Sequence, residues 1–188
     1  MRIVALVSGS GTTLQAVLNA VAQGRIVAQI VAVGADQPCG GVERAKAAGV
    51  PTFVVTPQAH PDRPAWNRAL QHEVRKHNPD LVLLAGFMRI LDAEFVHAFA
   101  PNLINTHPAL LPSFPGAHGV RDALTYGVKI TGATVHRVVP EVDAGQILAQ
   151  VSVPVLTGDD ELTLHERIKI AERELVVQTL AELVSAVN

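Results

Sequence analysis

The sequence predicts an α/β fold built on a doubly wound, mostly parallel sheet, with a late antiparallel extension and a long C-terminal helix. Apolar runs alternate with segments of helical spacing over roughly the first half of the chain, and this alternation is typical of parallel sheets. The chain is 48% hydrophobic but only 4% aromatic. Its core is therefore expected to be rich in Val, Leu, Ile and Ala, as in strands buried on both faces.

Strands and helices of the first half are expected in strict order. Apolar runs that end at glycine or polar residues predict strands at 3–7, 26–33, 52–55, 81–85 and 103–106. The run 81–85 is the most apolar and is expected at the centre of the sheet. Helical spacing followed by stop signals predicts helices at 13–22, 42–48, 64–77 and 92–99. Gly24 and Gly49 mark two of the stops, and Asp92 caps the last of these helices.

The pattern changes in the second half of the chain. Two strands are expected at 130–139 and 146–153, joined by a turn at 140–145, and one helix is expected at 160–187. Ligands of doubly wound sheets lie at the carboxyl ends of the strands, where the chain order switches. Segments 9–13, 86–91 and 105–108 follow such ends, so we expect them to share one cleft.

Composition excludes several classes of function. A net charge of −2 without a long basic run argues against broad nucleic-acid binding. The single cysteine, Cys39, excludes a disulfide framework. No apolar run approaches membrane-spanning length, and the apolar N-terminal run is too short for a signal peptide. We expect a soluble, cytoplasmic protein with one domain over residues 1–188.

A glycine loop at residues 8–15 joins the first predicted strand to the first helix. Gly11 lets the backbone approach a ligand, and free N–H groups at the helix start favour an anion. The hydroxyls of Thr12 and Thr13 add donors. Leu14 stands where a dinucleotide loop needs its third glycine, and no Gly-Lys-Ser/Thr follows, so a monophosphate fits best. The alternative is a helix cap without a ligand.

An amide, an imidazole and a carboxylate form the candidate catalytic group. Asn105 and His107 are two residues apart at the end of a predicted strand, so they face one spot. An amide N–H can stabilise an oxyanion, and a histidine can move a proton near neutral pH. Asp143 follows the next strand, and the three groups suggest acyl-type transfer. The alternatives are a structural His-Pro pair and a turn aspartate.

A zinc site is the competing interpretation of the histidines. His107, His118 and His136 could in principle supply three ligands. No HExxH motif or close histidine spacing supports such a site. We therefore expect no metal.

Four motifs together resemble the folate-dependent phosphoribosylglycinamide formyltransferases: SGSGTTLQ at 8–15, LAGFMRIL at 84–91, NTHPALLPSFPG at 105–116 and GATVH at 132–136. The resemblance implies a Rossmann-like formyltransferase fold. It implies transfer of a formyl group from 10-formyltetrahydrofolate to glycinamide ribonucleotide in purine biosynthesis. It also implies a phosphoribosyl-binding half at 1–100 and a catalytic, folate-binding half at 101–188 with the C-terminal helix.

The resemblance implies a role for each catalytic residue. Asn105 would donate to the oxygen of the tetrahedral centre that forms when the amine attacks the formyl carbon. His107, as imidazolium, would stabilise that charge and protonate the leaving folate nitrogen. Asp143 would keep His107 charged and could accept a proton from the amine. Ala144 follows it where many relatives have glycine, which narrows the conformations of this loop.

The resemblance also implies binding residues and partners. The substrate phosphate and ribose would contact Gly11, Thr12, Thr13, Lys169 and Glu172. Folate would contact Arg63, Met88, Arg89, Ile90, Leu91, Val139, Pro140, Glu141 and Val142. The partners are these two small molecules, with no metal, nucleic acid or membrane, and a homodimer remains open.

Three alternatives remain from the sequence. Methionyl-tRNA formyltransferases share the catalytic motif but carry a further C-terminal domain, whereas this chain ends at Asn188 and is not basic. Formyltetrahydrofolate deformylases pass the formyl group to water and have an N-terminal regulatory domain. A non-catalytic folate- or phosphosugar-binding module is the third alternative, and the intact trio argues against it.

Overall fold

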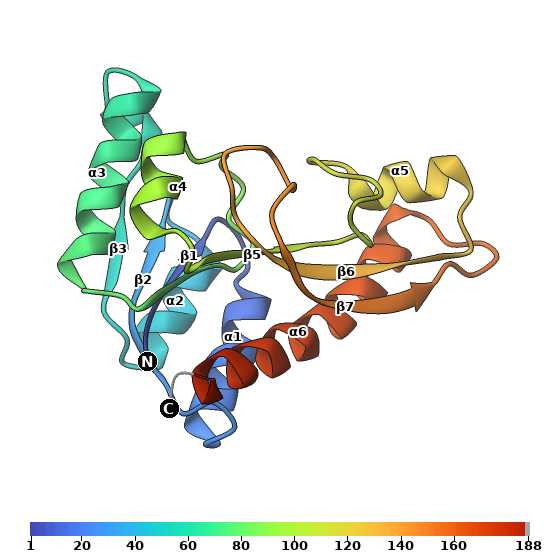
Figure 1. Ribbon diagram of the computed structural model, residues 1–188, viewed down its shortest axis with the longest axis horizontal. Coiled ribbons are helices and arrows are strands. Elements are labelled where there is room, and N and C mark those ends of the chain that lie inside the picture. Colours follow the sequence, from blue (N-terminus) through green and yellow to red (C-terminus); the bar gives the residue numbers. More distant parts are fainter. Residues whose placement is uncertain (187–188) are drawn as a thin grey trace.

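Seven strands form one sheet in the computed structural model, which describes residues 1–186 (Figure 1). The strand order is β3-β2-β1-β4-β5-β6-β7. All neighbours from β3 to β5 pair parallel, and β6 and β7 add antiparallel pairs. The predicted fold class is confirmed, and β4 lies at the centre. The strands are Arg2–Val7 (β1), Gln29–Ala35 (β2), Thr52–Val54 (β3), Leu81–Leu84 (β4), Leu103–His107 (β5), Ile130–Arg137 (β6) and Ile147–Pro154 (β7).

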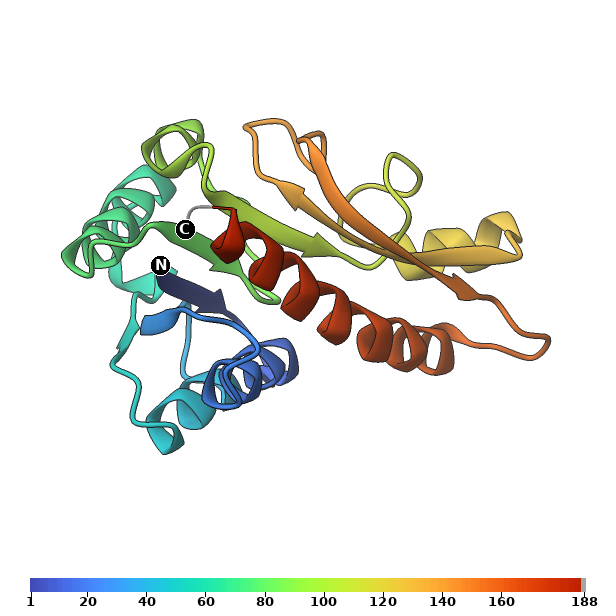
Figure 2. The same cartoon turned by 60° about the horizontal axis from the view of Figure 1, so that its bottom comes forward.

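Helices cover both faces of the sheet. Figure 2 shows the long helix α6 running beneath β6 and β7, on the side of α1, while α3 and α4 lie on the opposite side. The helix α5 lies near the end of the β6–β7 pair that is opposite the loop joining the two strands (Figure 1). The helices are Thr12–Ala22 (α1), Gly40–Ala47 (α2), Arg63–Lys76 (α3), Ala93–Phe99 (α4), Gly119–Tyr126 (α5) and Glu161–Ser185 (α6), with a 3-10 turn at Pro57–Ala59.

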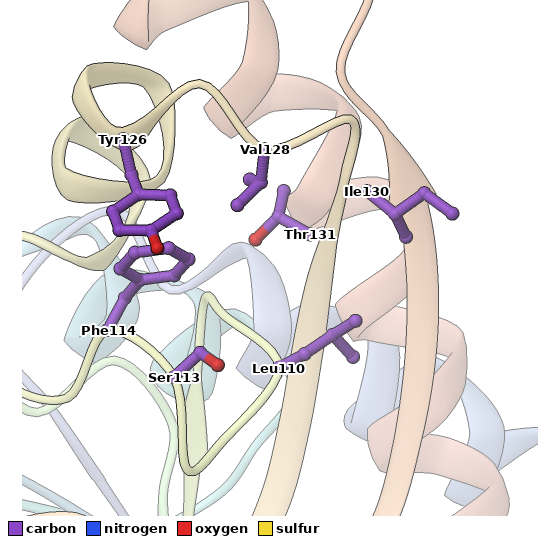
Figure 3. A pocket seen from close by; sticks show the side chains of 7 residues that line it. All are labelled: Leu110, Ser113, Phe114, Tyr126, Val128, Ile130 and Thr131. Carbon is purple, nitrogen blue, oxygen red and sulfur yellow. The ribbon is translucent and has the colours of Figure 1, made fainter.

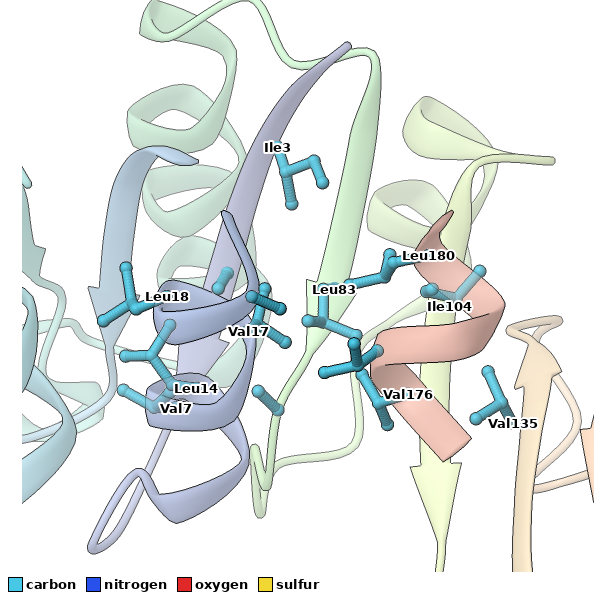
Figure 4. Packing of buried hydrophobic residues seen from close by; sticks show 14 of the residues in the cluster. Ile3, Val7, Leu14, Val17, Leu18, Leu83, Ile104, Val135, Val176 and Leu180 are labelled. Atoms are coloured by element: carbon cyan, nitrogen blue, oxygen red, sulfur yellow. The ribbon is translucent and has the colours of Figure 1, made fainter. Parts of the chain in front are cut away.

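Two apolar cores follow from the alternation of side chains along the strands. In β1, Ile3 and Val7 pack towards α1 and α6, whereas Leu6 packs towards α3 and α4. Figure 4 shows the first core, where residues of β1, β4 and β5 meet α1 and α6. Because both faces are covered, β4 is apolar at every position, and β1 is apolar after Arg2. This explains why they are continuous apolar runs in the sequence.

Some boundaries differ from the prediction. The segment from residue 26 is not yet strand, because Arg25 and Ile26 donate to the carbonyl of Ala20 in a turn that closes α1. The helix α5 was not predicted; it is short and ends at Tyr126, and the next residue, Gly127, adopts a left-handed φ of 84°. The predicted cap of α4 at Asp92 is confirmed. The last residue of the predicted C-terminal helix, Val187, lies outside the described residues.

The switch in strand order lies between β1 and β4. The chain runs from β1 outwards to β3, and then returns to β4 on the other side of β1. The loops that leave β1 and β4 contact each other: Ser8 N–H donates to the Gly86 carbonyl at 3.2 Å, and Met88 N–H donates to Ser8 Oγ at 2.9 Å. The carboxyl end of β5 is adjacent. The three segments expected to share a cleft therefore leave neighbouring strands.

Shortening one buried side chain of the central strand β4 tests the packing of the fold. Leu83 is fully buried between β4 and the helices α1 and α6. Leu83→Ala is expected to lower the free energy of unfolding by about 2–5 kcal/mol, because it removes buried methyl groups and leaves a cavity. Chemical denaturation measures the change. Val27→Ala is the control, since Val27 is 73% exposed, and a cost equal to that of Leu83→Ala would contradict this packing.

Candidate active site

The carboxyl end of β5 positions the first two candidate catalytic side chains. Asn105 and His107 lie on one face of the strand, and Thr106 between them faces the opposite side. The strand is held by β4 on one side and by β6 on the other. The antiparallel register sets Asn105 opposite His136 of β6. Their side chains meet, with 3.4 Å between Asn105 Nδ2 and His136 Nε2.

Asp143 completes the cluster from the loop between β6 and β7. One carboxylate oxygen lies 3.3 Å from His107 Nδ1, and the other lies 3.5 Å from His136 Nε2. The backbone N–H of Gly116 donates to the same carboxylate at 2.8 Å. Asp143 has a left-handed φ of 54°, a conformation that aspartate tolerates better than most residues. The structure thus brings the three predicted catalytic residues together.

In each of the two histidines, a contact with a backbone carbonyl indicates which ring nitrogen carries a hydrogen. His107 Nε2 lies 2.8 Å from the carbonyl of Phe114, and His136 Nδ1 lies 2.9 Å from the carbonyl of Arg137. A carbonyl only accepts, so each of these nitrogens carries a hydrogen. The other ring nitrogen of each histidine faces the Asp143 carboxylate.

The environment of Asp143 favours its ionised form. Burial raises the pKa of its carboxyl. The contact with His136, the N–H of Gly116 and the charge on His107 act in the opposite direction and outweigh burial. The pKa of Asp143 is therefore lower than its ordinary value of 3.8. A carboxylate is in place beside His107 throughout the neutral range.

The predicted phosphate loop has the backbone geometry of an anion site. Gly11 precedes α1 with a left-handed φ of 70°, and among the described residues no side chain caps this helix start. A Cβ on Gly11 would stand 2.4 Å from the Cα of Gly41 in α2. Only glycine fits there. The N–H groups of Thr12 and Thr13 lie in the first turn of α1, where backbone N–H groups have no acceptor within the helix and favour an anion.

The helix α6 brings Glu172 to the opposite face of β5. Thr106 donates its hydroxyl hydrogen to Glu172 Oε1, and both side chains are buried. Burial raises the pKa of Glu172, although the hydroxyl of Thr106 and the charges of Lys169 and Arg173 partly oppose it. Lys169 itself contacts Glu166 at 2.7 Å. Lys169 and Glu172 share one face of α6, as the spacing in the sequence predicted.

The predicted folate residues fall into two loops and one helix start. The loop after β4 leaves Met88 and Ile90 exposed at 77% and 63%, while Leu91 is buried. Arg63, at the start of α3, donates to the carbonyl of Ile90. Arg89 is held against the buried carboxylate of Asp36 at 2.6 Å.

The second loop, after β6, carries the remaining predicted folate residues. Val142 is 50% exposed there, next to Asp143. Both arginines named above, Arg63 and Arg89, line a cavity of about 220 Å³. Its other lining residues are Pro57, His60, Asp62 and Trp66. Exposed apolar side chains and a guanidinium-lined cavity fit a flat apolar ring with an anionic tail.

A groove of about 380 Å³ borders the site at Phe114. Figure 3 shows the rings of Phe114 and Tyr126 against each other, with Val128 and Thr131 beside them. The two ring centroids are 5.9 Å apart in an edge-on arrangement. The groove contains none of the candidate catalytic side chains. It shares with them only Phe114, whose carbonyl faces His107.

Clustered metal-ligating side chains and membrane-spanning helices are both absent from the described residues. Within residues 1–186, no group of three histidine, cysteine, aspartate or glutamate side chains is arranged to hold a metal ion. No helix in the described part of the chain is long and apolar enough to cross a membrane.

The sequence interpretation missed most of the groups that hold the catalytic residues. The sequence suggested His136 only as a possible zinc ligand and as part of the GATVH motif, and it did not predict the contact of Thr106 with Glu172. The alternation of β5 gave a signal for Thr106, because a strand residue between two site residues faces the other side. No sequence signal marks the Phe114 carbonyl or the Gly116 N–H. Backbone groups are placed by the path of the loop alone.

The lowered pKa of Asp143 predicts how stability depends on pH. A carboxyl that ionises more readily in the folded state stabilises that state above its unfolded pKa, near 3.8. The contribution disappears as the pH falls through the lower folded pKa. The wild type is therefore expected to be more stable than Asp143→Asn at pH values well above 3.8, and to lose this advantage as the pH falls below 3.8 and through the folded pKa. Urea denaturation at several pH values measures it, and a pH-independent difference would contradict the ionic role.

Comparison with known proteins identifies the family. A family model described as formyl transferase matches residues 1–180. Phosphoribosylglycinamide formyltransferase from Mycobacterium tuberculosis is 55% identical over 182 residues, which cover 97% of this chain and 84% of that protein. The Escherichia coli protein of the same name is 41% identical over 176 residues, which cover 93% and 83%.

A solved structure agrees with these sequences. Glycinamide ribonucleotide transformylase 1 from Symbiobacterium toebii is similar with a TM-score of 0.96 and 41% identity, covering 99% of this chain and 88% of that one. The family resemblance drawn from the four motifs is confirmed. The chain belongs to the formyl transferase family.

Proposed function

We infer that this protein transfers the formyl group of 10-formyltetrahydrofolate to the amine of glycinamide ribonucleotide, giving formylglycinamide ribonucleotide and tetrahydrofolate. The reaction is a step of de novo purine biosynthesis. The convergence of Asn105, His107 and Asp143 at one strand end carries this inference. It is supported by family membership over nearly the whole chain and by relatives whose names state this activity.

Asn105 is proposed to stabilise the charge that develops on the formyl oxygen. Its amide has two N–H groups. The amide nitrogen lies 3.4 Å from His136 Nε2, and an N–H is proposed to donate to a substrate oxygen. The amide is held before the substrates arrive, because its cross-strand neighbour fixes it. Donors that are oriented in advance are typically worth about two to three orders of magnitude in rate.

His107 and Asp143 are proposed to handle the protons. As an imidazolium beside the Asp143 carboxylate, His107 stabilises the tetrahedral centre. Both of its ring nitrogens already face protein acceptors. Donation to the leaving folate nitrogen therefore requires the contact with the Phe114 carbonyl to open when the substrates bind. Asp143 can take the proton that the attacking amine loses, directly or through water.

The two substrates are proposed to bind on either side of this group. The start of α1 with Gly11, Thr12 and Thr13 would receive the phosphate, together with Lys169. Glu172 would accept hydrogen bonds from the ribose hydroxyls. The folate ring would lie against the residues of the two exposed loops, namely Met88, Arg89, Ile90, Leu91, Val139, Pro140, Glu141 and Val142. Arg63 would attract the carboxylates of the folate tail.

The broader organisation is also a proposal. Residues 1–188 would act as one formyltransferase domain, with phosphoribosyl binding in 1–100 and catalysis and folate binding in 101–188. The pathway suggests that the protein works in the cytoplasm. A homodimer is the assembly we propose, and sedimentation velocity distinguishes it from a monomer.

An absorbance assay for tetrahydrofolate formation tests the function. The wild type is expected to turn over 10-formyltetrahydrofolate only when glycinamide ribonucleotide is present. His107→Ala is expected to lower kcat by about two to four orders of magnitude, because it removes the group that balances charge and moves a proton. His72→Ala is the matched control, since His72 is exposed on α3.

The other outcomes of this assay would contradict the proposal. Folate release without the ribonucleotide would indicate hydrolysis, with water as the formyl acceptor. Folate binding without turnover would indicate a binding module. Full activity of His107→Ala would remove the imidazole from the mechanism.

A further inference from the structure

Thr106, the middle residue of the strand end that carries Asn105 and His107, has no part in the formyl-transfer steps described above. Thr106 lies between Asn105 and His107, and its side chain faces α6 instead of Asp143. Its hydroxyl donates to Glu172 Oε1. Thr106 is 9% exposed and Glu172 is 8% exposed. A buried hydroxyl and a buried carboxylate therefore meet directly across the interface between β5 and α6.

This contact connects a rigid strand to a long, adaptable side chain. Thr106 belongs to a strand with hydrogen-bonded neighbours on both sides. A glutamate side chain has three torsions and loses considerable freedom when it is fixed. The Thr106 hydroxyl is the only side-chain hydrogen bond that the structure places on Glu172 within residues 1–186. The orientation of this carboxylate therefore depends on Thr106.

The contact also favours the ionised carboxylate. Burial raises the pKa of Glu172, and the hydroxyl of Thr106 lowers it, as do the nearby charges. The charged groups that face it are Lys169 and Arg173 from α6, whereas β5 contributes the neutral hydroxyl. An apolar residue at position 106 would leave one carboxylate oxygen buried without a donor, which disfavours the charge further.

We propose that Thr106 is a positioning residue for the ribonucleotide substrate: by donating to Oε1 of Glu172, it orients Oε2 towards the ribose hydroxyls. The inference rests on the role proposed above for Glu172. The two faces of the strand end would then have different functions. Asn105 and His107 serve formyl transfer, and Thr106 serves ribose binding through Glu172.

Steady-state kinetics of two substitutions test this role. Thr106→Val removes the hydroxyl with little change of shape and is expected to raise KM for glycinamide ribonucleotide about tenfold, with kcat within about twofold. Thr106→Ser keeps the hydroxyl and is expected to restore KM to within about twofold. Thr179→Val is the matched control. Thr179 is also buried, but its hydroxyl donates to the Leu175 carbonyl within α6.

The pH profile separates positioning from a structural effect. Without the hydroxyl, Glu172 takes up a proton at higher pH, and a protonated carboxyl is a weaker acceptor. KM for the ribonucleotide is expected to rise as the pH is lowered. In Thr106→Val this rise is expected to begin at a higher pH than in the wild type. Thr179→Val is expected to leave the profile unchanged. If Thr106→Val does not fold, Thr106→Ala removes the same hydroxyl and is expected to give the same rise.

A double-mutant cycle with Glu172→Ala separates the two proposals. If KM is unchanged in Glu172→Ala alone, the role of Glu172 in ribose binding fails, and that of Thr106 fails with it. If KM rises in Glu172→Ala but not in Thr106→Val, only the role of Thr106 is overturned. The expected result is that Thr106→Val raises KM in the wild-type background and has no further effect beside Glu172→Ala. A loss of kcat without a change in KM would also overturn the proposal.

Discussion

The register of β5 is the constraint on which the site depends. This strand has a parallel neighbour, β4, and an antiparallel neighbour, β6, so its position is fixed from both sides. Successive side chains point to opposite faces, and a slip of one residue would exchange them. Asn105 and His107 would then face α6, and Thr106 would face Asp143. The apolar residues that precede them, Leu103 and Ile104, lie in different cores and oppose such a slip.

The partly buried carboxylate of Asp143 and the buried carboxylate of Glu172 both lie beside this strand end, and their pKa values shift in opposite directions. Asp143 meets two imidazoles and a backbone N–H, and its pKa is lowered in spite of burial. Glu172 has one hydroxyl donor and two nearby cations, and burial prevails. Burial therefore does not decide the charge of a carboxyl by itself; the number and kind of groups that face it do. Asp143 suits charge balance and proton transfer, and Glu172 suits hydrogen bonding to hydroxyl groups.

The sequence predicted the parts of this fold that depend on local pattern. Apolar runs revealed the buried strands, including the central position of 81–85, and Asp92 marked a helix start. The two-residue spacing of Asn105 and His107 correctly placed both on one face. Patterns could not reveal groups whose position depends on distant chain, such as the carbonyl of Phe114 or the pairing of His136 with Asn105. The roles of Asp143 and the substrate residues came from family resemblance, since spacing alone does not bring a late loop to an earlier strand.

The contact between Gly11 and Gly41 has a consequence for motion. The loop after β1 and the start of α2 touch backbone to backbone: Gly41 N–H donates to the Gly9 carbonyl at 2.9 Å, and Arg44 donates to the Ser10 carbonyl at 2.8 Å. At the point of closest approach a glycine stands on each side, and a Cβ on Gly11 would be 2.4 Å from the Cα of Gly41. A displacement of this loop would therefore either break these backbone contacts or carry α2 with it. The conformation of the loop is in this way coupled to the position of α2, a helix that contributes none of the candidate catalytic residues.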